Sequence, residues 1–464
     1  MACNGSACQS GCYRDGYEAA TPGDGAAATA PDNGNGNATT NGLCVKCKVN
    51  EVFSDGGGGA GDDGRFCAEC FRSNLFGKFR HAITSNAMIA PTDNVLVAFS
   101  GGPASRVALQ FVHDMQYKAQ KNFDASRDRS LPVFGVGVAF IDESAASAPS
   151  SDKVMDMAIK DIKSIVLELA PPTKELHIFS IERLYLGDSN DQRNKLKEVL
   201  DAVTDPTGKE DLLGHLRMLV LQKIASENGY TRVVLGSCTS RISCHVISAT
   251  VKGRGYSLPA DIQYVDARWE VPLVLPLRDC LAQELNMLCR LDGLKTIGLP
   301  YETCHTINSL ISTFVALLQE ENPSRESTIV RTAGKLNPFA FNRIPEIKDI
   351  NVPLATRRRQ KRSNIKLNGS ISSESFCPMC YCPIMPTELG ILKAQEVSSD
   401  SFDASCCSSC RFQILPQDPT RMEDFYSNLP PLLVARATRR NPPDPSSLRE
   451  HIQDYLLLDS ENEE

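Results

Sequence analysis

The sequence contains no run of about 18 consecutive apolar residues, the length that a membrane-spanning helix requires, so we expect no membrane span. The N-terminal stretch MACNGSACQSGCYRDG lacks the apolar centre of a secretory signal peptide, and we therefore expect a cytoplasmic protein. An excess of positive charge is also absent, since the formal net charge is −7. A contact with nucleic acid therefore requires a local basic surface or the help of a partner.

Histidine is scarce, with 7 residues, and none of them stands at a spacing typical of a metal site or a catalytic triad. Cysteine is abundant, with 18 residues. Because thiols stay reduced in the cytoplasm, these cysteines indicate metal ligands, reactive thiols or core residues rather than a disulfide framework.

Four cysteines near the N-terminus follow the pattern C-x2-C-x19-C-x2-C. Two residues between cysteines allow a tight turn to direct both sulfurs at one ion, and two such turns complete a tetrahedral site. We expect a closed structural zinc site. Two alternatives stay open. An iron–sulfur cluster takes the same four ligands, and a redox-active C-x-x-C is possible, although a redox site would need only one of the two pairs. The predicted ligands are Cys44, Cys47, Cys67 and Cys70.

A second set of cysteines near the C-terminus repeats this arrangement as C-x2-C-x26-C-x2-C. It predicts a second structural zinc site, with Cys382 and Cys406 as rival ligands. The predicted ligands are Cys377, Cys380, Cys407 and Cys410.

Between the two cysteine sets, strand-like and helical patterns alternate, which implies a largely parallel sheet covered on both faces. The expected strands are 94–99, 133–141, 175–181 and 232–236, and the expected helices are 103–118, 152–168, 208–228, 278–293 and 305–321. The predicted fold class is therefore α/β, a Rossmann-like domain flanked by two small four-cysteine metal-binding modules.

The stretch NVLVAFSGGPAS (94–105) has the layout of a phosphate-binding turn between a strand and a helix. Glycines let the backbone turn sharply and bring its amides close to a phosphate, and Pro103 suits the first turn of the helix. A plain turn that needs glycine for tightness is the alternative. The candidate nucleotide-binding residues are Ser100, Gly101, Gly102 and Ser105.

AFSGGPAS resembles the SGGxDS signature of the PP-loop ATP pyrophosphatase superfamily. Two further stretches resemble the same superfamily. Its second substrate-facing loop is similar to LGSCTSRISCHVISATVKGRGYSL, and its "PLR" segment is similar to VPLVLPLRDCLAQEL. Together with the cysteine sets, the resemblance covers about residues 43–415. Its order of motifs is similar to that of the cytoplasmic tRNA 2-thiolation protein 2 family, the second subunits of the wobble-uridine thiolation complex.

The sequence departs from the catalytic members of the superfamily at two places. They carry an aspartate where this chain has Ala104, and a Gly-His pair followed by acids where it has GSCTSR (236–241). Nucleotidyl transfer depends on metal and charge placement. The resemblance therefore implies a degenerate site with weak or partner-dependent ATP binding and no catalytic residue. No C-x-x-C pair lies between residues 71 and 376 to supply reactive sulfur.

The resemblance implies a heterodimer that 2-thiolates the wobble uridine, position 34, of the tRNAs for Lys, Glu and Gln. This chain would be the non-catalytic subunit that supports tRNA binding, and its partner would be the catalytic tRNA 2-thiolation subunit. Sulfur would come from a ubiquitin-related carrier protein. Two alternatives stay open: a self-sufficient adenylating tRNA sulfurtransferase, and a zinc-bearing adapter without a tRNA role.

TRRRQKR (356–362) holds five cations in seven residues, which predicts contact with the tRNA backbone. A solvated linker and a nuclear-import signal are the alternatives. The glycine-flanked loop VKGRGYS adds two cations where ligands bind in doubly wound folds, with a structural turn as the alternative. The candidate tRNA-binding residues are Lys252, Arg254, Arg357, Arg358, Arg359, Lys361 and Arg362.

Composition and pattern divide the chain into six parts. They are a disordered arm (1–42), an N-terminal four-cysteine zinc module (43–75), a PP-loop-like α/β domain (85–300), a helical segment with the basic linker (301–370), a C-terminal four-cysteine zinc module (371–415) and a tail with an amphipathic helix (416–464).

Overall fold

A computed structural model describes residues 42–52, 66–126, 132–146, 152–298, 305–342, 357–358, 361, 375–385 and 402–438. The elements named below all lie within residues 43–464, which form one unit by themselves. Apart from Gly42, the arm predicted to be disordered lies outside the described residues. So do Arg359, Arg362 and the helix predicted in the tail.

A six-stranded sheet lies at the centre of the described residues, in the order β3-β2-β1-β4-β6-β5. The strands are β1 (Asn94–Ala98), β2 (Gly135–Asp142), β3 (Glu175–Ser180), β4 (Arg232–Val234), β5 (Val265–Asp266) and β6 (Leu273–Val274). Neighbouring strands run parallel, except that β5 is antiparallel to β6. This confirms the predicted α/β class with a largely parallel sheet.

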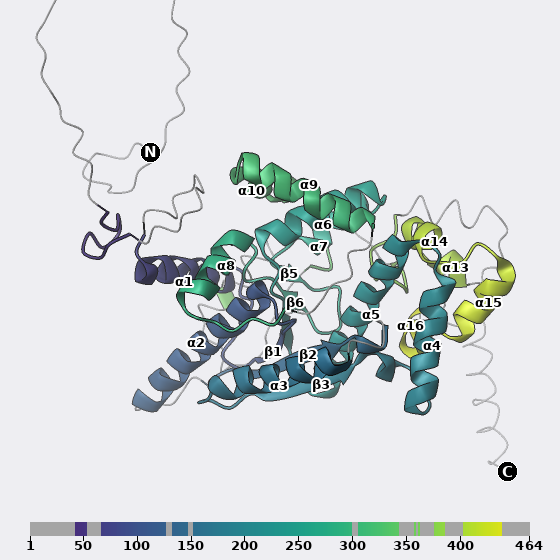
Figure 1. Cartoon of the computed structure of the whole chain (residues 1–464), viewed down its shortest axis with the longest axis horizontal. Coiled ribbons are helices and arrows are strands. Elements are labelled where there is room, and N and C mark those ends of the chain that lie inside the picture. The colour runs from purple at the N-terminus through teal and green to yellow at the C-terminus, as the bar shows by residue number, and fades with distance from the viewer. Residues whose placement is uncertain are drawn as a thin grey trace, which may run out of the picture. The chain divides into compact units, whose positions relative to one another are not determined.

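One face of the sheet is buried under helices from residues 68–168 and from residues 282–291 (Figure 1). Successive residues of a strand point to opposite faces, and Val95 and Val97 of β1 point to this one. Val107 and Phe111, four positions apart on one helix, pack in the same cluster, as an amphipathic helix requires. The covering helices are α1 (Ala68–Ser85), α2 (Pro103–Ala125), α3 (Asp152–Glu168) and α8 (Ala282–Leu291).

The opposite face is covered by α5 (Pro206–Glu227), by α4 (Ser189–Ala202) and by the C-terminal part of the chain. Figure 1 shows the yellow C-terminal helices beside α4 and α5. Leu96 of β1 and Val233 of β4 lie in the same hydrophobic cluster as residues beyond 375. The C-terminal helices are α13 (Phe402–Ser405), α14 (Ser408–Gln413), α15 (Pro419–Ser427) and α16 (Pro431–Thr438).

A third group of helices packs together beside β6. Ile242 and Ala249 of one helix meet Val330 of another in a small cluster of their own. These helices are α6 (Thr239–Val251), α7 (Leu258–Asp261), α9 (Ile307–Glu321) and α10 (Ser324–Ala333). In the described part of the chain, no helix combines the length and the apolar character needed to cross a bilayer.

Candidate functional site

The SGG loop lies at the point where the order of strands in the sheet reverses. From β1 the sheet extends to β2 and β3 on one side and to β4 on the other. Ser100 to Gly102 follow β1, and Gly236 to Cys238 follow β4, so both loops meet at the carboxyl ends of adjacent parallel strands. In open α/β sheets, ligands bind in the crevice at this switch point.

Gly101 adopts a backbone conformation that the rest of the loop depends on. Its φ of +82° lies in the left-handed region, which glycine enters at low cost. A Cβ built on Gly101 would meet Cβ of Ile297 at 2.9 Å. The Ile297 amide donates to the carbonyl oxygen of Gly101 at 2.9 Å. The segment after α8 therefore packs against the turn.

The Ser105 hydroxyl organises the turn from inside. Its Oγ accepts from the amide and from Oγ of Ser100, both at 3.2 Å, and donates to the carbonyl oxygen of Gly102 at 2.9 Å. Ser105 is buried at the start of α2. The two serines predicted to bind a phosphate are therefore brought together, and they bond to each other; nucleotide binding stays a prediction.

The loop that follows β4 packs against the first turn of α2. A Cβ built on Gly236 would lie 2.7 Å from the amide nitrogen of Ser105, so only glycine allows this approach. Neither α2 nor α6 has an acidic residue in its first turn. One carboxylate does reach α6 from a distant part of the chain: the Ser240 hydroxyl donates to Glu326 of α10 at 2.5 Å. Sequence reasoning missed this acid because 86 residues separate the two.

Cysteines around the sheet have the properties of packing residues. Burial raises the pKa of the Cys238 and Cys280 thiols, and it raises the pKa of Cys244 and of Cys289 to about 11. A thiol in that range is protonated near neutral pH and is a weak nucleophile.

The N-terminal cysteines come together at the start of α1. All four predicted sulfurs lie within 4.8 Å of one another. Cys67 is the N-cap of α1, and its Sγ lies 3.8 Å from that of Cys47. Lys48, with a φ of 57°, closes the tight turn of the first pair. The geometry fits the predicted four-thiolate site.

The C-terminal cysteines form a second cluster with the same geometry. The sulfurs of Cys377, Cys380, Cys407 and Cys410 lie within 4.8 Å of one another. Tyr381, with a φ of 59°, makes the tight turn of the first pair, and Cys407 caps α14.

The donor set of the C-terminal cluster suits a soft metal ion. Burial acts to raise the pKa of Cys377, but hydrogen bonds from neighbouring thiols, Cys380 first, hold that pKa well below its usual value. Four convergent sulfurs, two of which (Cys377 and Cys407) have a lowered pKa, fit Zn²⁺ or an iron–sulfur cluster. Cys382 lies 3.1 Å from Cys380, sulfur to sulfur, so the rival ligand is also at hand.

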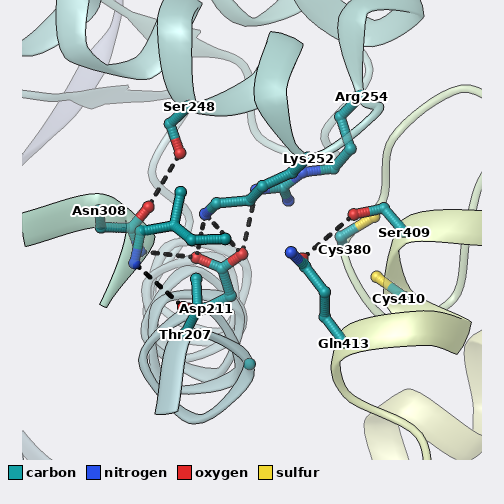
Figure 2. Close-up of polar contacts among 12 residues, drawn as sticks. Thr207, Asp211, Ser248, Lys252, Arg254, Asn308, Cys380, Ser409, Cys410 and Gln413 are labelled. Atoms are coloured by element: carbon teal, nitrogen blue, oxygen red, sulfur yellow. Dashed lines mark hydrogen bonds and ion pairs between the residues drawn. The ribbon is translucent and has the colours of Figure 1, made fainter. Parts of the chain in front are cut away.

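Lys252 and Arg254 belong to an internal ion cluster beside the second set of cysteines (Figure 2). The Lys252 ammonium donates to both carboxylate oxygens of Asp211 at 2.8 Å, and Arg254 donates to one of them at 3.2 Å. The Lys252 side chain is 1% exposed and that of Arg254 is 13% exposed. Both charges face Asp211. The tRNA contact predicted for these two residues stays a prediction.

Asp211 also ties the neighbouring helices together. Asn308 of α9 donates to Asp211 at 3.0 Å and accepts from Ser248 of α6 at 2.8 Å. Burial acts to raise the pKa of Asp211, but Arg254 and Lys252 hold it below its usual value. One carboxylate on α5 thus fixes α6, α9 and the GRG loop (253–255) in place.

The basic stretch is described at three positions. Arg358 and Lys361 are exposed and Arg357 is half-buried. The exposed charges remain accessible to a polyanion, so the predicted tRNA contact stays a prediction here too.

Similarity to known proteins identifies the family. A protein from Arabidopsis thaliana called "Cytoplasmic tRNA 2-thiolation protein 2" is 57% identical over 463 residues, and the alignment covers 99% of each chain. This chain belongs to that family. The family model of the same name matches residues 306–408, and the protein of that name from Oryza sativa subsp. indica is 50% identical, with 90% of each chain covered.

A solved structure with a similar chain trace is the U34-tRNA thiolase NcsA from Methanococcus maripaludis with its 4Fe-4S cluster. It is 18% identical, has a TM-score of 0.48, and the match covers 63% of this chain and 86% of that one.

Proposed function

We propose that this chain is a cytoplasmic subunit of a tRNA 2-thiolation complex. Full-length similarity at 57% identity to a protein that bears that name is the observation that carries the proposal. The target is the wobble uridine, position 34, of the tRNAs for Lys, Glu and Gln. Its partner is the catalytic tRNA 2-thiolation subunit, and a ubiquitin-related carrier supplies the sulfur as a thiocarboxylate.

The chemistry of thiolation requires groups that this chain lacks in its described part. The C2 oxygen of uridine is a poor leaving group, so ATP first adenylates it with release of pyrophosphate; sulfur then attacks C2 and AMP departs. Organising magnesium and the triphosphate needs acids at the loop, but the first turns of α2 and α6 contain none. The buried thiols beside the sheet have raised pKa values. We assign the catalytic steps to the partner.

The two cysteine clusters hold structural ions in this proposal, and zinc is the ion that we expect. Ser100, Gly101, Gly102 and Ser105 form a loop that binds ATP weakly or only with the partner present. The exposed cations of 356–362 contact the tRNA backbone.

The first test measures 2-thiouridine in bulk tRNA from cells that lack this chain, as a mobility shift on a mercury-containing gel. The thiolated band should vanish and return with the intact gene. Rescue by a Gly102→Asp variant tests the loop, because an acid there repels phosphate. A thiolated band that persists without the chain contradicts the proposed function.

A second test separates a subunit from a self-sufficient enzyme. The purified chain alone, given ATP and unmodified tRNA, should release no pyrophosphate, and addition of the catalytic partner should start turnover. Activity of the chain alone that disappears in a Glu326→Gln variant would favour the self-sufficient alternative, because Glu326 accepts from Ser240 in the first turn of α6. Failure of the two-chain complex to bind tRNA at low salt would favour the adapter.

A further inference from the structure

The ion cluster of Asp211, Lys252 and Arg254 and the C-terminal cysteine cluster are close neighbours (Figure 2). Arg254 lines a small pocket whose other wall includes Cys382 and Cys407. Gln413, one turn after Cys410 on α14, accepts from Ser409 at 3.3 Å, and a Cβ built on Gly208 of α5 would meet the Gln413 carbonyl oxygen at 2.0 Å. The first turns of α5 therefore touch the helix that supplies two of the sulfurs.

Arg254 keeps part of its donor capacity unused. Its Nη2 donates to Asp211, whereas its Nε is shielded from solvent and has no hydrogen-bond partner among the described residues. Burial acts to lower the pKa of Arg254, but Asp211, followed by Cys380 and Cys410, holds that pKa above its usual value. Arg254 therefore contacts the Asp211 carboxylate and lines the same pocket as Cys382 and Cys407.

The charges of the two clusters have opposite signs. Lys252, Arg254 and Asp211 sum to +1, and all three side chains are at most 13% exposed. Four thiolates around a divalent ion sum to −2. A buried net charge is costly unless an opposite charge lies nearby, so each cluster lowers the cost of burying the other.

We propose that the Lys252–Asp211–Arg254 triad is the counter-charge of the negative metal–thiolate centre that forms when an ion binds at Cys377, Cys380, Cys407 and Cys410, with Arg254 as its positioning residue. The proposal rests on the metal site proposed above. It makes the GRG loop part of the support of the metal centre, and it predicts that the affinity for the ion depends on a charge carried by α6's C-terminal loop.

The test follows the release of zinc from the full-length chain to a coloured chelator. Arg254→Gln removes one charge at similar size. The affinity for the C-terminal ion should fall roughly 10- to 100-fold, the usual cost of losing an outer-shell partner, and its release should be correspondingly faster. Arg254→Lys, which keeps the charge, should stay close to the wild-type rate. Arg331→Gln, at an exposed position of α10, is the matched control. A Cys47→Ser variant identifies the release phase of the N-terminal ion, which should be unchanged.

A double variant distinguishes an effect of the triad's net charge from an effect of its contacts between elements. Asp211→Asn combined with Arg254→Gln leaves Lys252 alone and restores the net charge of +1, so release should return toward the wild-type rate. If the triad acted only by holding elements together, the double variant would release zinc faster than either single variant. That result, or an Arg254→Gln variant with wild-type release, overturns the proposal.

Each failure has its own signature. If Arg254→Gln does not fold, the double variant decides alone, by the same criterion of wild-type release. A wild-type chain that carries no metal at the C-terminal cluster overturns the metal site itself. Neither result alters the gel assay of 2-thiouridine, which tests the proposed function independently.

Discussion

At the scale of single residues, the loop at the switch point depends on one glycine more than on the other. Gly101 has a positive φ and lies against Ile297, whereas Gly102 has a φ of −72° and open surroundings. Local sequence identifies both glycines as turn residues. It does not distinguish them, because Ile297 lies almost 200 residues further along the chain.

Replacing Gly101 with alanine should therefore destabilise the chain by about 1–3 kcal/mol, the range for backbone strain of this kind. Gly102→Ala is the matched control. It should change the free energy of unfolding by no more than about 1 kcal/mol, because alanine is only a poorer N-cap. Urea unfolding of the two variants and the wild type measures the difference. Equal effects would contradict the geometry described for Gly101.

Lys174 provides a prediction about pH. Its ammonium donates to the carbonyl oxygens of Leu169 at 2.7 Å and Pro172 at 3.0 Å and contacts His113 Nδ1 at 2.9 Å, and burial lowers its pKa to about 8. In the unfolded chain the pKa is about 10.4. The folded state thus binds this proton less tightly, and its contribution to the free energy of unfolding rises as pH increases from about 8 to about 10.4.

A Lys174→Met variant should lack this rise. Urea unfolding of both proteins between about pH 7 and about pH 10.4 measures the difference in slope, which isolates Lys174 from other groups that titrate there. Parallel curves for the two proteins would show that the lysine does not change its proton affinity on folding.

At the scale of elements, the sequence predicts best what local signals encode. The apolar run 94–99 and the glycines before Pro103 predict β1 and the start of α2, and the structure confirms both. Helix α6 has no such signal, because Ser, Thr, Cys and Ile are indifferent helix formers. It forms since Ile242 and Ala249 bury against α10, a contact that no local pattern contains.

The candidate site divides in the same way. Each set of four cysteines follows from spacing alone, since the two turns of a site are written in the chain as C-x-x-C. The ion cluster around Lys252 does not follow from local spacing, because Asp211 lies 41 residues before Lys252 and Asn308, which bonds to Asp211, lies on α9. A glycine-flanked basic loop looks alike in sequence whether its charges face a ligand or a buried carboxylate.

The contact between α5 and α14 gives a prediction at this scale. A Cβ at Gly208 would overlap the Gln413 carbonyl oxygen at 2.0 Å, so Gly208→Ala should lower the free energy of unfolding by about 1–3 kcal/mol. Gly214 lies on the same helix with nothing within 4 Å of an added Cβ. There alanine should stabilise the helix by about 1 kcal/mol. Opposite signs in urea unfolding support the packing; a neutral Gly208→Ala contradicts it.

At the scale of the whole molecule, the two cysteine clusters differ in their relation to the core. Cys377, Cys407 and Cys410 belong to the hydrophobic cluster that contains Leu96 and Val233 of the sheet. The N-terminal cysteines belong to none of the hydrophobic clusters of the described residues. The domain boundaries drawn from sequence stay a prediction, but the C-terminal cysteines share their core with the sheet.

Metal removal should therefore affect the two ends of the chain unequally. Cys407→Ser should lower the free energy of unfolding of the whole core by about 3 kcal/mol or more, in one cooperative transition. Cys47→Ser should release the other ion with a smaller loss of stability. Calorimetry combined with metal analysis measures both. Equal losses from the two variants would show that the C-terminal cluster is not part of the central core.

The hydrophobic cluster shared by the sheet and the C-terminal helices also has a consequence for folding during synthesis. Leu96 and Val233 emerge early, but Phe425 and Leu433, which share their cluster, are made about 200 residues after β4. At roughly 5–20 residues per second, that interval lasts on the order of 10–40 seconds, during which one face of the nascent sheet has only α4 and α5 as cover. The segment 402–438 therefore completes this hydrophobic cluster only well after β4 has been made.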